Sequence, residues 1–392
     1  MRQNSNTSRS DSLRVTKRTV DAEHSLLRGR LTSLDVFRGV TIALMILVNN
    51  PGGTAHYSFL QHATWNGLTV ADVVFPFFIF IVGAAIPFAF VSKLRQGTSR
   101  KELLGHIVRR TVILFALGLF VNGFPTFNLE TFRIMGVLQR IALCYFFASI
   151  IFLFLKPRWR IILATVIPIA YWTLLTLIPV PGSGSGFLTE NGNLAGYVDR
   201  LLLNGHLYTQ TWDPEGLMST IPAFATVLMG VLAGQHLQSN RTPQTKSKKL
   251  LFFGGLSLAI GSLWSFWFPI NKNLWTSSYV AFTGGIAIIL LAACFYLVDT
   301  KGYATVTRPF TVLGLNAIFV YVLSEIVNLA LIYANIPLTQ STSTTLKSLI
   351  YERLFASWAG SLHGSFLYAL AYLAFCWAIA AILYRKRIFL KV

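Results

Sequence analysis

The amino-acid sequence predicts an all-α, polytopic membrane protein with about 10 transmembrane helices, and three observations favour this fold class. Hydrophobic residues make up 54% of the 392 positions and charged residues only 12%, about half the charged share of a typical soluble domain. Long apolar runs recur along the chain and raise the mean hydropathy to +0.58. Basic residues gather in alternate connections between these runs. This composition excludes a disordered protein and argues against a soluble enzyme.

The predicted elements follow one another as apolar runs, each close to the ~20 residues that cross the hydrocarbon. Backbone groups find no water inside lipid, so each run must be a helix rather than an open strand. A β-barrel would need short alternating segments instead. The runs cover residues 34–50, 70–92, 107–122, 136–155, 160–179, 217–236, 249–268, 275–297, 311–333 and 364–384. Among the connections, residues 50–69, 180–216 and 334–363 form the longer loops, expected on the outer side.

The distribution of basic residues predicts the orientation of the chain. Most of the 33 Lys and Arg residues lie in the N-terminal tail, in the connections after every second span, and at the C-terminus. The positive-inside rule then places both termini in the cytoplasm, which agrees with an even number of spans. The net charge of +19 therefore reflects membrane topology and contact with anionic lipid rather than a nucleic-acid partner.

Domain organisation is simple. Residues 1–30 are polar and basic without an apolar core, so they are expected to be a disordered cytoplasmic tail rather than a signal peptide. Residues 31–392 are expected to form one transmembrane domain. The 3 cysteines all lie inside apolar runs, and no CxxC occurs. Neither a disulfide framework nor a bound metal is expected.

Ionisable residues at membrane depth are expensive and mark candidate functional positions. A first group falls in the outer half of the membrane or at its edge and is expected to line one polar cavity: Asn49, His62, Asp72, Arg140 and Glu325. A second group falls at the inner edge: Asp35, Arg38, Arg109, Arg110 and the run Arg385, Lys386 and Arg387.

Structural explanations for several of these residues stay open. Asp35 and Arg38 are three residues apart, so they can pair and cap the first span. Arg140 can form a structural ion pair with Glu325 or Asp72. The Arg385–Arg387 run has the composition of a plain membrane anchor.

His62 is the strongest candidate for chemistry, because its segment HATWNGLTVADVVFPFF (62–78) runs directly into a helix that opens with Asp72. Histidine titrates near neutral pH, and it serves both as a base and as an acyl-carrying nucleophile. The basic inner edge suits a phosphate-bearing ligand from the cytoplasm. These residues alone leave open an acyltransferase, an anion or sugar transporter, and a structural membrane protein.

Several segments resemble a known family. The matching segments are RLTSLDVFRG (30–39), HATWNGLTVADVVFP (62–76), GVLQRIAL (136–143), YVDRLLLNGHLY (197–208), WDPEGLMSTIP (212–222), INKNLWTSSYV (270–280), LGLNAIFVYV (313–322) and LYRKRIF (383–389). Through them the sequence resembles the heparan-alpha-glucosaminide N-acetyltransferase family, in its bacterial form, over about residues 30–392. The resemblance implies that acetyl-CoA on the cytoplasmic side donates an acetyl group to the amine of a glucosamine on the far side. It also implies a homodimer.

The resemblance also implies roles for particular residues. The family's catalytic histidine falls on His62, and a helping asparagine falls on Asn49 rather than on Asn50. Asp72 is expected to set the tautomer of His62 or to pair with the substrate ammonium. The candidates for the phosphates of CoA are Arg38, Arg110, Arg385, Lys386 and Arg387. The candidates for the polar cavity and the acceptor are Trp65, Asn66, Arg140, Asn271, Asn316 and Glu325.

The sequence departs from the animal enzyme in two places. A short basic tail stands where that enzyme carries a lumenal domain, and the loop 180–216 has no cysteine. We therefore expect a multi-pass enzyme of the plasma (inner) membrane that acetylates an amino sugar or a cell-envelope glycan. The alternative is an amino-sugar transporter that uses the same polar cavity.

Overall fold

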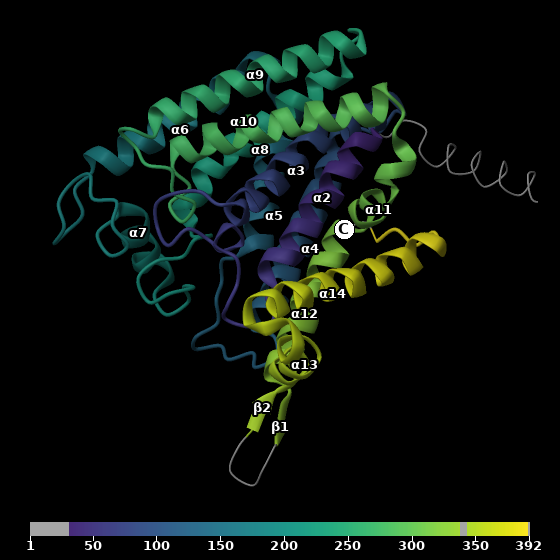
Figure 1. The fold of residues 1–392 in the computed structure, drawn as a ribbon. Coiled ribbons are helices and arrows are strands. Elements are labelled where there is room, and N and C mark those ends of the chain that lie inside the picture. The colour runs from purple at the N-terminus through teal and green to yellow at the C-terminus, as the bar shows by residue number, and fades with distance from the viewer. Residues whose placement is uncertain (1–30, 338–342, 391–392) are drawn as a thin grey trace, which may run out of the picture.

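The computed structural model describes residues 31–337 and 343–390 as an assembly of long helices. The expected cytoplasmic tail, residues 1–30, lies outside the described residues. Within the described part, only one two-stranded hairpin interrupts the helical architecture (Figure 1). The all-α prediction is therefore confirmed.

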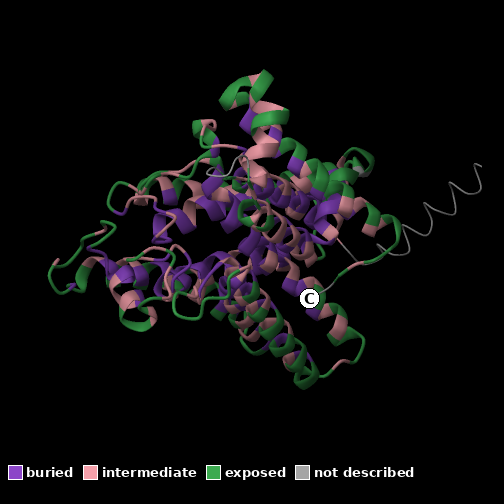
Figure 2. Ribbon diagram, turned by 90° about the horizontal axis from the view of Figure 1, so that it is seen from below, coloured by how far each residue is buried: buried purple, intermediate pink, exposed green. Residues whose placement is uncertain are grey.

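Five helices occupy the centre of Figure 1. They are α2 (Thr32–Asn49), α3 (Val70–Arg95), α4 (Arg100–Gly123), α5 (Val137–Phe154) and α8 (Leu217–Gln238). Helix α3 packs against α2, α5 and α8, and α4 packs on α5. Buried residues concentrate in the middle of the assembly, whereas the peripheral helices carry exposed faces (Figure 2).

Close approach of α3 and α8 depends on glycine. A Cβ atom on Gly230 would lie 2.0 Å from the Phe80 carbonyl oxygen, and one on Gly83 would lie 2.0 Å from the Val227 carbonyl oxygen. Small residues four apart let membrane helices approach backbone to backbone, and Gly230 and Gly234 have this spacing. This contact fixes α3, which carries Asp72 at its first turn.

Three helices form a layer along the top of Figure 1. They are α6 (Pro157–Leu177), α9 (Pro243–Trp264) and α10 (Ser277–Cys294), which continues into a π-helical segment, Phe295–Thr300. A short helix, α7 (Leu194–Leu203), lies at the left of the figure, in the long connection between α6 and α8.

The C-terminal elements form the remaining part of the assembly. They are α11 (Ala304–Leu315), α12 (Ala317–Tyr333), β1 (Asn335–Pro337), β2 (Ser343–Thr345), α13 (Leu346–Tyr351), a π-helical segment (Glu352–Ala356) and α14 (Ser357–Arg385). Asn335 pairs with Thr345 in the antiparallel hairpin. Helices α11 and α12 meet at Asn316 with a bend of 67°. The expected loop 334–363 is thus mostly regular structure in its described residues.

Among the described residues, eight helices are long and apolar enough to span a membrane, and the bent pair α11–α12 makes a ninth. The predicted spans match these helices except at residues 249–268. Helix α9 forms there, but Lys246, Lys248 and Lys249 lie in its first turns and reduce its apolar length. Whether α9 crosses the membrane decides whether the chain has an even number of spans.

Candidate active site

His62 lies at the entrance to α3 and faces the carboxylate of Asp72. The His62 Nδ1 atom is 2.8 Å from Asp72 Oδ1. Asp72 has a side chain only 1% exposed, whereas the His62 side chain is 47% exposed. With Nδ1–H donated to the carboxylate, the other ring nitrogen keeps a lone pair. The arrangement therefore presents Nε2 of His62 as a base or nucleophile at the protein surface.

The local sequence explains why Asp72 is held so firmly. Asp72 is the third residue of α3, and its Oδ2 atom accepts the backbone N–H of Thr69 at 3.1 Å and of Ala63 at 3.0 Å. The hydroxyl of Thr69 donates to the same oxygen. Together these contacts form a capping box that satisfies donors at the start of the helix. The Tyr279 hydroxyl also donates to the Asp72 carbonyl, at 2.6 Å. Oδ1 remains directed at His62.

Lys272 comes from the connection before α10 and covers the imidazole. Its Nζ atom lies 3.0 Å from His62 Nδ1, 3.4 Å from His62 Nε2 and 3.7 Å from Asp72 Oδ1. An atom this close to both ring nitrogens would clash with the ring carbon between them if it lay in the ring plane. The amine therefore lies over the face of the ring, and Asp72 keeps the in-plane contact with Nδ1.

Burial shapes the chemistry of this lysine, whose side chain is 17% exposed. Burial lowers the pKa of Lys272 from its ordinary value, although the carboxylates of Glu215 and Asp72 oppose that shift. Ammonium and neutral amine are thus closer in free energy here than for a lysine in water.

The loop that carries His62 and the connection that carries Lys272 are joined to each other by hydrogen bonds. Asn271 donates its side-chain amide to Asn66 Oδ1 at 3.1 Å, and the Gly67 backbone N–H donates to the Ile270 carbonyl at 2.8 Å. Asn271 Oδ1 also accepts the Leu274 backbone N–H. The structure therefore brings Asn66 and Asn271 together, as structural partners that fix Lys272 above His62.

Aromatic residues stand beside the same loops. Trp65 donates its indole N–H to the Leu188 carbonyl at 2.6 Å, and its ring meets Trp212 edge to face at 5.2 Å. The sequence between α6 and α8 is in this way attached to the His62 loop. Trp275, by contrast, is fully buried, and its indole donates to Thr226.

Arg133, Asp213 and Glu215 form a second group of charged residues. Arg133 makes a bidentate pair with Asp213, at 2.9 and 2.6 Å, and also contacts Glu215 at 2.6 Å. Burial lowers the pKa of Arg133, but the two carboxylates outweigh it and raise that pKa above its ordinary value. Burial raises the pKa of Glu215, but Arg133, Arg140 and Lys272 together outweigh it and lower the pKa of that carboxyl. The contacts order the segment 212–216 next to Lys272.

Asp199 of α7 caps the start of α8. Its Oδ1 atom accepts the backbone N–H of Leu217 at 2.9 Å and of Met218 at 3.3 Å. A Cβ atom on Gly216 would lie 1.8 Å from Asp199 Oδ2, so a glycine is required there. Burial raises the pKa of Asp199 to about 6, against the two backbone contacts that lower it.

Arg140 is fully buried under Trp275, with its guanidinium 4.8 Å from the ring centroid. It donates to Thr220 and Ser219 and to the Gly216 carbonyl. The expected ion pair with Glu325 or Asp72 does not form among the described residues. The reason is positional: hydroxyls of α8 lie closer to the guanidinium than either carboxylate.

Asn49 and Glu325 form a separate contact. The exposed side chain of Asn49, at the end of α2, lies beside the Glu325 carboxylate of α12. Its neighbour Asn50 is buried and donates to the Ile46 carbonyl of its own helix.

Of the candidates at the inner edge, Arg38 lies at the break between α11 and α12, and the basic residues at the end of α14 precede a segment that contacts this break. Arg38 pairs with Asp35 at 2.9 Å and donates to the Gly314 carbonyl. Asn316 accepts the Leu390 backbone N–H and donates to the Ile388 carbonyl. Asn316 therefore holds the C-terminal segment that follows Arg385, Lys386 and Arg387, all exposed, and it does not join the His62 group. Arg110 of α4 stacks on Tyr145 at 4.5 Å.

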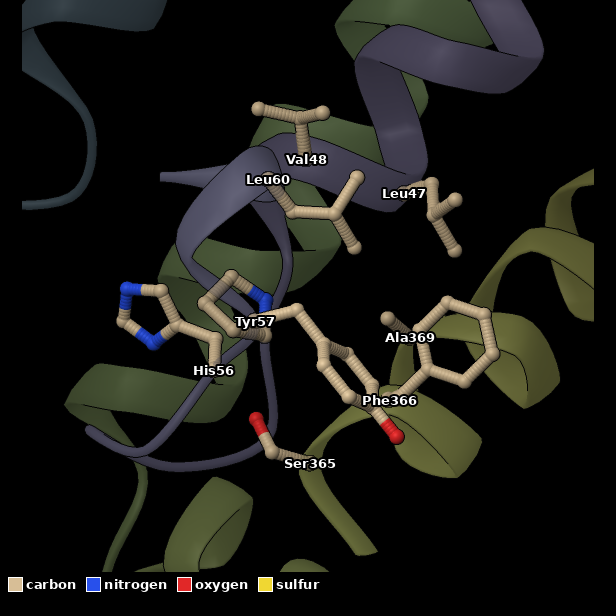
Figure 3. Close-up of a pocket in the computed structure, with 9 residues that line it drawn as sticks. Leu47, Val48, His56, Tyr57, Leu60, Ser365, Phe366 and Ala369 are labelled. Atoms are coloured by element: carbon tan, nitrogen blue, oxygen red, sulfur yellow. The ribbon is translucent and has the colours of Figure 1, made fainter. Parts of the chain in front are cut away.

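A pocket lies between the loop 50–69 and α14 (Figure 3). Its lining is mostly apolar: Leu47, Val48, Pro51, His56, Tyr57, Leu60, Ser365, Phe366 and Ala369. At its edge, Tyr57 contacts His363 at 2.6 Å. His62 does not line this pocket.

Comparison with known proteins identifies the family. Residues 30–266 match the family model described as heparan-alpha-glucosaminide N-acetyltransferase, catalytic. The chain belongs to this family. It is 35% identical to heparan-alpha-glucosaminide N-acetyltransferase of Homo sapiens, in an alignment that covers 77% of this chain and 54% of that protein. It is also 35% identical to the protein of Mus musculus, over 76% of this chain and 53% of that protein. The chain thus spans about half the length of these relatives, and the expected family is confirmed.

Sequence reasoning did not single out Lys272, Arg133 and Glu215 as site residues. One signal for Lys272 was available, because it is a lysine in an outer connection, where basic residues are rare. Its partners His62 and Asp72 lie about 200 positions away in the sequence, and no local pattern reports such a contact.

Proposed function

We propose that this protein is a membrane acetyltransferase that moves the acetyl group of acetyl-CoA to the amine of a glucosamine-type sugar or glycan. The donor is cytoplasmic and the acceptor lies on the outer side. The observation that carries the proposal is the contact between buried Asp72 and exposed His62. Family membership and the clustering of apolar helices agree with it.

His62 performs the proton transfer in this proposal. The acceptor ammonium must lose protons before its nitrogen attacks a thioester, and Nε2 of His62 takes the proton released during attack. Asp72 holds the imidazole in the tautomer that leaves Nε2 unprotonated, and it stabilises the imidazolium that forms. In the alternative order of steps, Nε2 first carries the acetyl group itself.

Asn49 has the role of an amide donor toward the developing oxyanion. Its contact with Glu325 holds the side chain at the outer end of α2. On the acceptor side, the edge-to-face pair of Trp65 and Trp212 offers aromatic surface to a sugar ring. The hydrogen bond between Asn66 and Asn271 fixes the two loops beside this surface relative to each other.

The phosphates of CoA are assigned to the inner basic residues. Arg38 stands at the α11–α12 break. Arg385 ends α14, and Lys386 and Arg387 follow it, just before the segment that Asn316 holds. Arginine forms charge-assisted, bidentate hydrogen bonds with phosphate, and lysine adds charge. Arg110 is also assigned to the phosphates, because its position along α4 is at the expected inner edge of the membrane.

The proposal assigns this protein to the plasma (inner) membrane, with lipid and a second copy of the chain as partners. The acceptor is proposed as an amino sugar or cell-envelope glycan rather than heparan sulfate.

The test compares the purified protein in detergent with His62→Ala and with the control His56→Ala, which changes another histidine of the same loop. Each is incubated with acetyl-CoA and glucosamine, and free CoA and N-acetylglucosamine are measured by mass spectrometry. We expect His62→Ala to lose at least about 100-fold in rate and His56→Ala to retain activity.

Equal activity of His62→Ala and wild type would remove His62 from the mechanism. If the protein binds acetyl-CoA but does not acetylate glucosamine, acetyl-CoA remains the proposed donor and another amine must be the acceptor. Absence of acetyl-CoA binding, together with uptake of amino sugar into vesicles, would establish the transporter instead.

A further inference from the structure

Lys272 places a primary amine where the proposed reaction needs one. The acceptor nitrogen must approach an acyl group that His62 activates or carries, and productive geometries bring reacting atoms to about 3–3.5 Å. Nζ of Lys272 lies 3.4 Å from His62 Nε2, the nitrogen that would carry the acyl group, and 3.0 Å from Nδ1, so the amine stands beside the position of that group. The loop contacts of Asn271 hold the lysine in place.

The direction of approach also fits. An acetyl group on Nε2 of an imidazole is coplanar with the ring, and a nucleophile attacks such a carbonyl carbon from above its plane. Nζ lies over the face of the ring rather than in its plane. Asp72 occupies the in-plane position at Nδ1, so it does not block this approach.

The surroundings decide when the amine is reactive. The charged groups that act on Lys272 are Glu215 from the segment before α8, Asp72 from α3 and Arg140 from α5. The two carboxylates favour the unreactive ammonium, whereas burial and Arg140 favour the neutral amine. Burial and Arg140 therefore make the neutral, nucleophilic amine easier to form at Lys272 than at a lysine in water.

From this geometry we infer that Lys272 is a site of self-acetylation, which the protein modifies with its own donor when no acceptor sugar is bound. The inference rests on the proposed function. In the step, the ammonium first releases one proton to water. The N–C bond to Nζ forms as the thioester C–S bond breaks, or as the acyl bond to His62 breaks. One of the two protons still on Nζ passes through His62 to the CoA thiolate and the other stays on the amide nitrogen, so the products are acetyl-lysine and free CoA.

Acetylation would also change the site. The amide carries no charge, so the ion pair with Asp72 at 3.7 Å is lost. The added acetyl group occupies space over the imidazole where the acceptor amine must bind. A protein kept with donor but without acceptor therefore loses activity as Lys272 becomes modified.

The experiment incubates the full-length protein in detergent with acetyl-CoA, with and without glucosamine, and maps acetyl-lysine by peptide mass spectrometry. Lys347 is the internal control, because it is another partly buried lysine whose Nζ contacts Asn328 instead of a histidine. We expect acetyl-Lys272 to accumulate without glucosamine, to decrease with it, and to exceed acetyl-Lys347. His62→Ala should lower acetyl-Lys272 by about 100-fold or more, and Lys272→Arg should lack the modification.

Each contrary outcome has a separate meaning. Acetylation of glucosamine with Lys272 unmodified would overturn this inference and leave the proposed function intact. Equal modification of Lys272 in wild type and His62→Ala would show background chemistry and overturn it as well. Failure to acetylate either amine would overturn both the inference and the proposed function.

Discussion

At the scale of single residues, the pairing of one exposed imidazole with one buried carboxylate is the feature that organises the site. Asp72 serves two purposes with its two oxygens, since Oδ2 caps α3 and Oδ1 faces His62. The same carboxylate thus links the start of a membrane helix to the orientation of the candidate catalytic histidine. A substitution at Asp72 that keeps the cap of α3 but changes the contact with His62 should separate these two roles.

Asp72→Asn is expected to keep the helix cap, because an amide oxygen at the third residue of α3 can still accept the Thr69 backbone N–H. The amide donates to Nδ1 or leaves it unpaired, so Nε2 no longer retains its lone pair reliably. We expect kcat to fall by about 10²–10⁴-fold with a small change in KM, measured as release of CoA. Glu102→Gln is the matched control, because Glu102 belongs to the capping box of α4 with Ser99. Wild-type kcat in Asp72→Asn would contradict the assigned role.

Asp199 predicts a pH dependence of stability. Its pKa in the folded protein is raised to about 6 by burial, so the folded state holds a proton that the unfolded chain releases at lower pH. This contribution to stability is therefore present below the unfolded pKa and is lost as pH rises through about 6. Asp199→Asn keeps an acceptor for Leu217 and Met218.

Thermal unfolding midpoints between pH 4 and 7 check this expectation. The midpoint of wild type should fall relative to Asp199→Asn as pH rises across this range. A constant difference between the two proteins over the whole range would show that Asp199 does not titrate there.

At the scale of elements, contacts between backbones position the helices that carry the site. Gly230 of α8 faces the Phe80 carbonyl of α3 with no space for a side chain. Gly230→Val should force α3 and α8 apart and destabilise the protein by about 1–3 kcal/mol. Gly255→Val in α9 is the control, because a Cβ there meets nothing within 4 Å.

Both variants carry the same β-branched residue in a helix, so their difference in unfolding midpoint isolates the interhelical contact. A midpoint of Gly230→Val equal to that of Gly255→Val would show that the two helices do not depend on this close approach.

At the scale of the whole molecule, α9 decides the topology. The positive-inside rule places both termini on one side, which requires an even number of spans. The eight apolar helices and the bent pair α11–α12 give an odd number unless α9 also crosses. Its exposed face supports crossing, because it carries the large apolar residues Phe252, Phe253, Leu256, Ile260 and Leu263. Such a surface is stable against lipid rather than water.

We therefore expect α9 to span the membrane and both termini to face the cytoplasm. The measurement labels single cysteines from outside intact cells, in a variant without Cys144, Cys294 and Cys376. A cysteine at Ser265, after α9, should be labelled, and cysteines at Asn240 and at the C-terminus should not. Labelling of the C-terminal position would refute a cytoplasmic C-terminus, and absence of labelling at Ser265 would refute the crossing of α9.

The sequence by itself determined the membrane class, the positions of most spans and the candidate histidine with its carboxylate. These features are local, because hydropathy over about 20 residues decides whether a helix crosses lipid. His62 and Asp72 also lie only 10 positions apart. A short segment and one helix start are enough to bring them together.

Only the tertiary structure decided which distant residues complete the site. Lys272 meets His62 across 210 positions and Arg133 meets Asp213 across 80, while Asn316 turns out to hold the C-terminal segment. Such contacts depend on which helices pack together and on the rotation of each helix about its axis. Hydropathy along the sequence predicts neither. The amine above the imidazole exists because the packing of α3 with α10 brings two loops to the same place.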